Sequence, residues 1–222
     1  MSIGSIRGVL FDFDGVLVDS ARVHRASWQE AFRRVLGRQM PDYPANELTG
    51  ASSHEIGERL AHLAGAPERA PELVQAKIEA LLDVVASPKP LPGAIEVTAS
   101  LHARGVPFGI ASNAPAQYVR RVAAELGIEA TAILGFEDVP RPKPAPDAYR
   151  ACARAIGFSD DTLGALLVCE DSVPGITAAK AAGMPTLGIA SMHDAQTLLG
   201  AGADLVAGDL SAARRLIPLF AR

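Results

Sequence analysis

The stretch Gly-Val-Leu-Phe-Asp-Phe-Asp-Gly-Val-Leu-Val-Asp-Ser, residues 8–20, decides the fold. Its apolar start is short and ends at Asp12, as a fully buried parallel strand does when polar groups follow its carboxyl end. A second carboxylate, Asp14, and the turn residue Gly15 come next. Taken alone, these residues also fit an ordinary turn. Because an unpartnered buried carboxylate is costly, however, the pair indicates a bound cation, or a carboxylate nucleophile beside an acid–base partner.

The same strand pattern recurs along the chain, each time as a short apolar run bounded by polar residues, glycine or proline. The predicted strands are Gly8–Asp12, Pro107–Ser112, Ala132–Gly135, Leu166–Glu170, Thr186–Ile189 and Asp204–Val206. Helical patterns alternate with them at Ala94–Arg104, Ala116–Leu126, Asp147–Ile156, Val173–Ala182 and Ala195–Gly200. This alternation predicts an α/β fold with a doubly wound parallel sheet and right-handed connections.

One block between the first two predicted strands contains helical patterns and no convincing strand. Its predicted helices are Arg22–Leu36, Ser53–Leu63, starting at Ser53 and His54, and Pro71–Val85. A proline-rich stretch, Ser87–Gly93, follows and has the composition of a hinge. We therefore predict two domains. Residues 1–19 and 91–222 would form an α/β core, and residues 20–90 a small inserted helical domain.

Composition limits the compartment and the partners. The chain has 222 residues, of which 49% are hydrophobic and 21% charged, and a formal charge of −4, which argues against nucleic acid as the main partner. Cys152 and Cys169 are too few for a disulfide framework and are expected to be buried. The N-terminus lacks a signal-peptide pattern, and no run approaches the roughly 20 apolar residues of a membrane span. We expect a cytoplasmic protein without a membrane partner.

Polar side chains also follow other predicted strands. Ser112 and Asn113 offer a hydroxyl and an amide that can bind phosphate oxygens. Lys143 stands between two prolines that fix its backbone, and it can neutralise crowded carboxylates and phosphate. Glu170 and Asp171 are adjacent acids that repel each other unless a cation lies between them. Because oxygen ligands suit Mg²⁺, the strand ends together predict a magnesium-dependent phosphate-transfer site.

These motifs resemble those of the haloacid dehalogenase (HAD) superfamily. The stretch from Asp12 to Ser20 is similar to the family's first motif, and Ser112-Asn113 to its second. The third and fourth motifs resemble residues 143–147 and 170–172. The resemblance spans nearly the whole chain. The helical block is similar to the cap of the β-phosphoglucomutase-like and phosphoglycolate phosphatase-like branch, so the resemblance implies a Rossmann-like core with a small cap domain.

The resemblance also implies residue roles. Asp12 would be the nucleophile that becomes a phospho-aspartate, and Asp14 the general acid and base. Ser112 would bind the transferring phosphoryl group, and Lys143 would steady Asp12 and the phosphate. Mg²⁺ would be held by oxygens of Asp12, the backbone carbonyl of Asp14, Asp171 and, directly or through water, Glu170. A cap closing over the site would exclude water and select the substrate.

Two activities of the family fit this sequence poorly. The family's dehalogenases lack the second acid of the first motif, whereas Asp14 is present here. Phosphonoacetaldehyde hydrolases form an imine with a cap lysine, but the corresponding loop, Leu48–His54, contains no lysine, and the first lysine in the chain is Lys77. A non-catalytic binding protein is a weak third alternative, because Asp12 and its partner motifs are intact.

The resemblance favours a phosphatase acting on a small phosphorylated metabolite, a sugar or sugar-acid phosphate, over a β-phosphoglucomutase-type mutase. His24 and Trp28 are similar to the mutase pattern. Ser53, however, stands where the mutase has a phosphate-gripping arginine, and Ser112-Asn113 is the form more usual in phosphatases. The residues expected to contact substrate are Asn113, His24, Ser53 and His54, with Ser52 and Arg59 as further candidates. We expect a monomer or a weak dimer.

Overall fold

The computed structural model describes residues 6–43, 50–83 and 88–220, and its centre is a six-stranded sheet. The strand order is β5-β4-β1-β6-β7-β8, and every pairing is parallel. The strands are β1 (Gly8–Phe11), β4 (Phe108–Ala111), β5 (Ala132–Leu134), β6 (Leu166–Glu170), β7 (Thr186–Ile189) and β8 (Leu205–Ala207). The predicted doubly wound α/β sheet is confirmed, and each strand end lies within about one residue of its predicted place, as boundary assignments allow.

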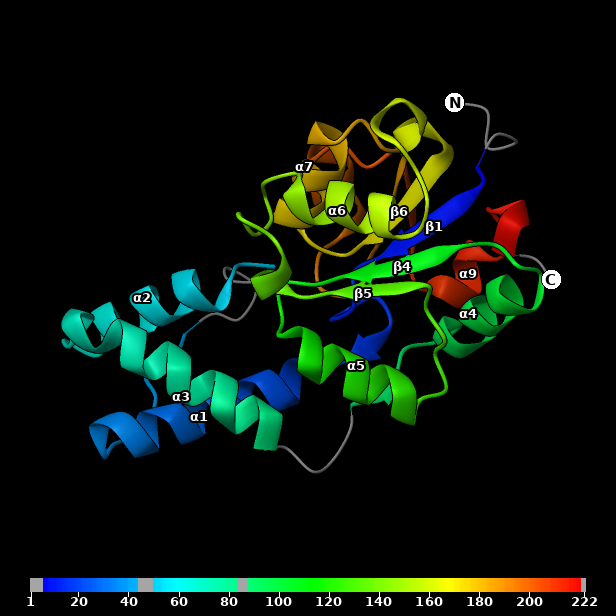
Figure 1. Cartoon of the computed structure of the whole chain (residues 1–222). Helices are drawn as coiled ribbons and strands as arrows, with labels where there is room; N and C mark the ends of the chain where they lie inside the picture. Colours follow the sequence, from blue (N-terminus) through cyan, green and yellow to red (C-terminus); the bar gives the residue numbers. More distant parts are fainter. Residues whose placement is uncertain (1–5, 44–49, 84–87, 221–222) are drawn as a thin grey trace.

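Helices cover both faces of the sheet, as Figure 1 shows. The side chains of β1 alternate between the faces, so Val9 and Phe11 enter one core and Leu10 enters the other. Helices α4, α5 and α9 pack on the Phe11 face, and α6 and α7 on the Leu10 face. These helices are α4 (Ala94–Ala103), α5 (Ala116–Glu125), α6 (Asp147–Ala155), α7 (Val173–Ala181) and α9 (Leu210–Ala213), and α8 (Ala195–Gly200) packs beside α7. Both cysteines are buried without a disulfide, as expected.

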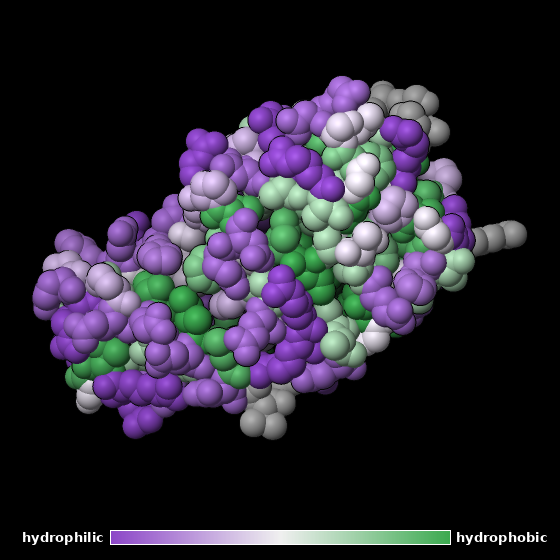
Figure 2. Space-filling view, viewed as in Figure 1, coloured by the Kyte–Doolittle hydropathy of each residue, from purple (hydrophilic) through white to green (hydrophobic). Residues whose placement is uncertain are grey.

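The helices that follow β1 form a separate lobe with its own apolar cluster. This helical lobe contains α1 (Ala21–Leu36), α2 (Ser53–Leu63), the short 3₁₀ helix η3 (Pro67–Arg69) and α3 (Ala70–Asp83). Trp28 and Phe32 of α1, Leu60 of α2 and Leu73 of α3 pack against one another. Figure 1 shows this lobe at one side of the sheet, and Figure 2 shows that the face of the lobe turned toward the viewer is mainly hydrophilic, with small apolar patches. The apolar face of each helix is thus buried within the lobe itself.

The two chain crossings between core and lobe lie side by side. Here β2 (Val18–Asp19) pairs antiparallel with β3 (Lys89–Pro90), and Leu91 N–H donates to Leu17 O at 2.9 Å. The proline-rich stretch predicted as a hinge therefore includes a short strand, which the sequence pattern did not reveal. Ser87, at its start, lies outside the described residues. The two crossings thus form a short two-stranded connection between the lobe and the core.

Helix α2 starts at Ser53, as predicted. Its N-cap is Ser52, because Ser52 Oγ accepts from Glu55 N–H and Glu55 reaches back to Ser52 N–H, forming a capping box. Ser53 is therefore the first helical residue and its hydroxyl is free for another partner. Leu48 and Thr49 of the predicted loop, and the predicted last residues of the third helix, 84–85, lie outside the described residues. In the parts of the chain that the structure describes, no helix is long and apolar enough to cross a membrane.

Candidate active site

The predicted strand-end groups meet where the strand order reverses. The central strand β1 lies between β4 and β6, and in open α/β sheets the crevice outside such a point binds ligands. A cavity of about 350 Å³ opens there. The residues predicted for the site that line it are Asp12, Asp14, His24, Ser53, Ser112, Asn113, Lys143, Glu170 and Asp171. The cavity also takes Trp28 and Lys77 from the helical lobe, so both lobes build it.

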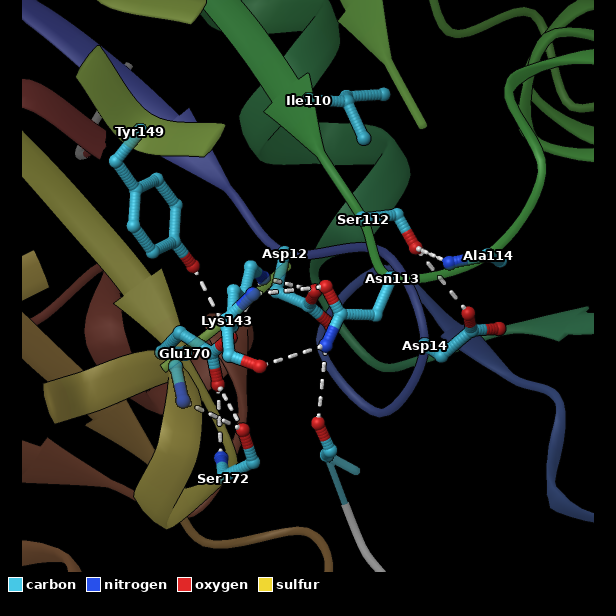
Figure 3. Close-up of polar contacts among 12 residues, drawn as sticks. Asp12, Asp14, Ile110, Ser112, Asn113, Ala114, Lys143, Tyr149, Glu170 and Ser172 are labelled. Carbon is cyan, nitrogen blue, oxygen red and sulfur yellow. Dashed lines mark hydrogen bonds and ion pairs between the residues drawn. The ribbon is translucent and has the colours of Figure 1, made fainter. Parts of the chain in front are cut away.

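Lys143 is the centre of the buried charge network, as Figure 3 shows. Its Nζ lies 2.5 Å from Asp12 Oδ1 and 2.8 Å from Glu170 Oε1, and its side chain is 2% exposed. Burial alone would lower the pKa of Lys143, but Asp12 and Glu170 together raise it. The lysine therefore stays charged and holds one oxygen of Asp12 in place. Lys143 is thus in direct contact with Asp12, the residue that the resemblance gives as its partner.

Glu170 has both carboxylate oxygens occupied. Oε1 accepts from Lys143 and from the hydroxyl of Tyr149 at 3.0 Å, and Oε2 accepts from the backbone N–H and hydroxyl of Ser172 at 2.8 and 2.9 Å. Gly175 leaves the space that the carboxylate needs, because a Cβ there would lie 1.7 Å from Oε1. In this arrangement Glu170 anchors Lys143. It would reach a metal through water more readily than directly.

The site holds more negative than positive charge. Burial raises the pKa of Asp12 to about 7; Lys143 opposes the shift, and Glu170 and Asp14 add to it. Burial, then Glu170 and Asp12, also raise the pKa of Asp171 well above its usual range. Asp12, Glu170 and Asp171 are thus three buried carboxyl groups around the single ammonium of Lys143. A divalent cation would relieve this imbalance and keep Asp12 ionised.

The oxygen atoms available at the site suit Mg²⁺, which does not need a site made wholly of side chains. Among the residues that the structure describes, no group of three or more His, Cys, Asp or Glu side chains could hold a metal alone. Mg²⁺, however, binds through one or two carboxylates and completes its shell with other oxygens. Asp12 and Asp171 can supply the carboxylates. Ser191 supports this side of the site, because its Oγ lies 2.6 Å from Gly15 O and 3.2 Å from Asp171 Oδ2.

Asp14 lies apart from the Lys143 network, beside Ser112 (Figure 3). His24 Nε2 is 3.1 Å from Asp14 Oδ1, and Ser112 Oγ is 3.5 Å from Asp14 Oδ2. Burial would raise the pKa of Asp14, but the charge and hydrogen bond of His24, with a hydrogen bond from Ser20, lower it.

Asn113 joins the core to the helical lobe. Its Oδ1 accepts from Lys143 N–H at 3.2 Å, and its Nδ2 donates to Lys143 O at 3.4 Å and to Gly50 O at 3.2 Å. Gly50, at φ +79°, packs so closely on the start of α7 that a Cβ would lie 2.4 Å from Ser172. Asn113 therefore fixes the lysine loop and seats the residues before α2 against the core.

Three of the residues proposed from the sequence for the cap do not reach the cavity lining that the structure describes. His54, the second residue of α2, packs edge-on against Phe136 at 6.2 Å between ring centroids. The hydroxyl of Ser52 caps the N-terminus of α2. Arg59 lies further along α2. His54 is thus placed at a contact between lobes rather than against a bound substrate.

Sequence reasoning missed Lys77, Tyr149 and Ser191. Tyr149 and Ser191 act through partners far along the chain, and no local motif marks them. The rarity of lysine in this chain could have singled out Lys77. Its position in the middle of a predicted helix, however, did not indicate that it lines the cavity. The sequence argument against imine chemistry considered only the loop Leu48–His54, which has no lysine. The cavity nevertheless contains an amine, because Lys77 of α3 lines it.

Fold and site together define an α/β enzyme that works at the carboxyl ends of parallel strands. Residues 6–183 match the family model described as haloacid dehalogenase-like hydrolase, and the chain belongs to that family. The chain is 32% identical over 210 residues to the validoxylamine A 7′-phosphate phosphatase of Streptomyces hygroscopicus subsp. limoneus, covering 92% of this chain and 94% of the relative.

A second relative and a solved structure agree. The fructose-1-phosphate phosphatase YqaB of Escherichia coli is 30% identical over 188 residues, covering 82% of this chain and 95% of that protein. A hydrolase from Pseudomonas syringae superimposes with a TM-score of 0.78 at 25% identity, covering 95% of this chain and 97% of that one. The chain is thus an enzyme of the phosphatase kind within its family, and the non-catalytic alternative is unsupported.

Proposed function

We propose that the protein is a Mg²⁺-dependent phosphatase that hydrolyses a small phosphate monoester through a phospho-aspartate on Asp12. The observation that carries this proposal is the cavity in which Lys143 holds Asp12 at 2.5 Å while Asp14 lies beside it on a separate set of partners. One carboxylate is thus prepared to attack and the other to move a proton. Two carboxylates in different environments are a common arrangement for dividing nucleophilic and acid–base roles.

In the first step, an Asp12 oxygen forms a bond to phosphorus as the bond from phosphorus to the ester oxygen breaks. Asp14, in its protonated form, gives its proton to the departing alcohol, and Lys143 and Ser112 stabilise charge on the phosphoryl oxygens. In the second step Asp14 takes a proton from a water molecule that attacks the phosphorus. Phosphate leaves and Asp12 is restored. Bound Mg²⁺, held by Asp12, Asp171 and the Asp14 carbonyl, would neutralise phosphoryl charge.

The helical lobe acts in this proposal as a cap, residues 20–90, on a core of residues 1–19 and 91–222. Gly50 seated against Asn113 and Ser172 supports a closed position, and the paired strands β2 and β3 give the pivot. Closure brings His24 and Ser53 over the core groups and excludes water. His54 would help hold the closed lobe against Phe136.

The substrate that we propose is a sugar or sugar-acid phosphate. The two phosphatase relatives named above act, by name, on a phosphorylated validoxylamine and on fructose 1-phosphate. A cavity of about 350 Å³ holds an ester of that size. The test is phosphate release from a panel of sugar, sugar-acid and glycolate phosphates, with Mg²⁺ and with chelator. We expect one ester class to be released rapidly only with Mg²⁺, whereas equal rates from wild type and Asp12→Asn would contradict the proposal.

A mutase is the second candidate because His24 contacts Asp14, the contact that made His24 a mutase signal in the sequence. Such an enzyme would return the phosphoryl group to a second hydroxyl instead of to water. Ser53 argues against a mutase, because it stands where the mutase has an arginine. Its hydroxyl accepts a hydrogen bond from Lys77. Conversion of β-glucose 1-phosphate to glucose 6-phosphate, primed with the bisphosphate, tests this candidate. Free phosphate as the sole product would reject it.

A further inference from the structure

Lys77 is a buried lysine that the proposed chemistry leaves without a role. It lies on α3, is 2% exposed and lines the cavity. Its Nζ donates to Ser53 Oγ at 2.9 Å and lies 5.8 Å from the centroid of the Trp28 ring. The ammonium is thus held on two sides by the lobe, from helices α1 and α2.

No carboxylate among the described residues forms an ion pair with Lys77. Lys143, equally buried, has two carboxylate partners, and Lys180 near the surface has Asp204. Burial lowers the pKa of Lys77 to about 8, with the charge of Asp14 opposing the shift. The side chain therefore remains mostly protonated at pH 7. A buried cation without a counter-ion is costly, so a ligand that brings a negative charge would be favoured there.

The position of Lys77 assigns it to the alcohol part of the substrate. Asp14 donates its proton to the oxygen that joins phosphorus to the alcohol, so the groups near Asp14 on the cap side face the alcohol. His24 contacts Asp14 directly, and Lys77 interacts with it electrostatically. The phosphoryl group would be bound by Lys143 and Ser112, which belong to the core rather than to the lobe. Lys77 is therefore placed to select the leaving group rather than to act on phosphorus.

We propose that Lys77 and Ser53 bind a carboxylate on the alcohol part of the substrate, so that the preferred substrates are phosphate esters of hydroxy acids or sugar acids. The inference rests on the phosphatase function proposed above. Ser53 Oγ accepts from Lys77, which leaves its own proton to donate. One ammonium and one hydroxyl then match the two oxygens of a carboxylate, and the Trp28 ring offers an apolar wall for the adjoining carbon chain.

Pairs of esters that differ by one carboxylate test the proposal. These are 6-phosphogluconate against sorbitol 6-phosphate, and 3-phosphoglycerate against glycerol 1-phosphate. We expect wild-type kcat/KM to favour the acid of at least one pair by about tenfold or more, the effect of a charge-assisted hydrogen bond. Lys77→Met should bring the ratio close to one, and Lys77→Arg should keep part of it. Gln75→Met, an exposed change on the same helix, should keep the wild-type ratio.

Equal wild-type rates on both members of each pair, or an unchanged ratio in Lys77→Met, would overturn the proposal. If Lys77→Met does not fold, calorimetric binding of the same esters to the Asp12→Asn protein decides, because the acid should bind about tenfold more tightly. Equal binding would overturn it. The underlying function fails separately: the phosphatase proposal is lost if no ester, nor acetyl phosphate, releases phosphate, or if Asp12→Asn releases phosphate as fast as wild type.

Discussion

Adding one methyl group at Gly175 should destabilise the protein, although the same change usually stabilises a helix. Gly175 lies in the first turn of α7 without a positive φ, so alanine fits its backbone. Replacing a helical glycine by alanine contributes up to about 1 kcal/mol of stability. Here, however, the new Cβ would lie 1.7 Å from Glu170 Oε1 and 1.9 Å from its Cδ. The carboxylate of Glu170 must move.

A carboxylate at the end of a side chain would normally swing away at little cost. Glu170 is 1% exposed and is hydrogen-bonded to Lys143, Tyr149 and Ser172. Its carboxylate therefore cannot move without breaking hydrogen bonds. Overpacking costs about 1–3 kcal/mol, and the loss of one charge-assisted hydrogen bond about 1.5–3 kcal/mol. After the helix gain is subtracted, Gly175→Ala should lose about 2–5 kcal/mol, or roughly 4–20 °C in melting temperature for a chain of this length.

Urea unfolding and thermal melting of Gly175→Ala measure this loss. The matched control is Gly200→Ala in α8, where an added Cβ meets nothing within 4 Å, and this variant should be as stable as wild type or slightly more so. Because Glu170 anchors Lys143, the Gly175 variant should also lose phosphate release. A Gly175→Ala protein as stable and active as wild type would refute the description of Glu170 as a fixed, fully bonded group.

Three further predictions concern the metal and the proton. Burial raises the pKa of Asp12 to about 7 and also raises that of Asp171, so the metal-free protein should lose stability as pH rises from about 4 through 7. Mg²⁺ should therefore raise the melting temperature more at pH 8 than at pH 5, and equal shifts would contradict this. Asp14→Asn should slow first-turnover release of the sugar from a sugar phosphate by about 10²–10⁴-fold. It should slow release of p-nitrophenol from p-nitrophenyl phosphate much less, because that group leaves unprotonated. Equal losses on the two esters would contradict the acid role of Asp14. Ser191→Ala should weaken Mg²⁺ binding about tenfold in thermal titrations, and an unchanged midpoint would show that Ser191 does not support Asp171.

Local sequence pattern predicted the sheet well because its four central strands, β4, β1, β6 and β7, are buried on both faces and are therefore mainly apolar. The run from Gly8 to Phe11 and the run from Leu166 to Glu170 show this directly. The pair β2–β3 was not predicted, because two-residue strands carry no periodic signal and β3 also contains a proline. Helix α2 was predicted at its observed bounds, Ser53–Leu63, because a polar start precedes its apolar pattern; the structure adds that Ser52 is the N-cap and pairs with Glu55.

The core half of the site was more predictable than the lobe half. Asp12 and Asp171 directly follow β1 and β6, and parallel strand ends must meet at one edge of the sheet. Lys143 lies in the loop before α6, where its two flanking prolines marked it. The substrate-facing residues depend on how the lobe rotates over that edge, which no local pattern contains. For this reason the sequence did not reveal that His54, predicted to contact substrate, packs against Phe136. It also did not reveal that Lys77 lines the cavity.

The most direct test of the central claim is to trap the phosphoenzyme. The protein should be mixed with a ³²P-labelled ester that it hydrolyses, quenched in acid within one turnover and digested. We predict label on the peptide that contains Asp12, removed by hydroxylamine as an acyl phosphate should be, and absent from Asp12→Asn. Full phosphate release by wild type without labelled Asp12, or undiminished release by Asp12→Asn, would contradict the account.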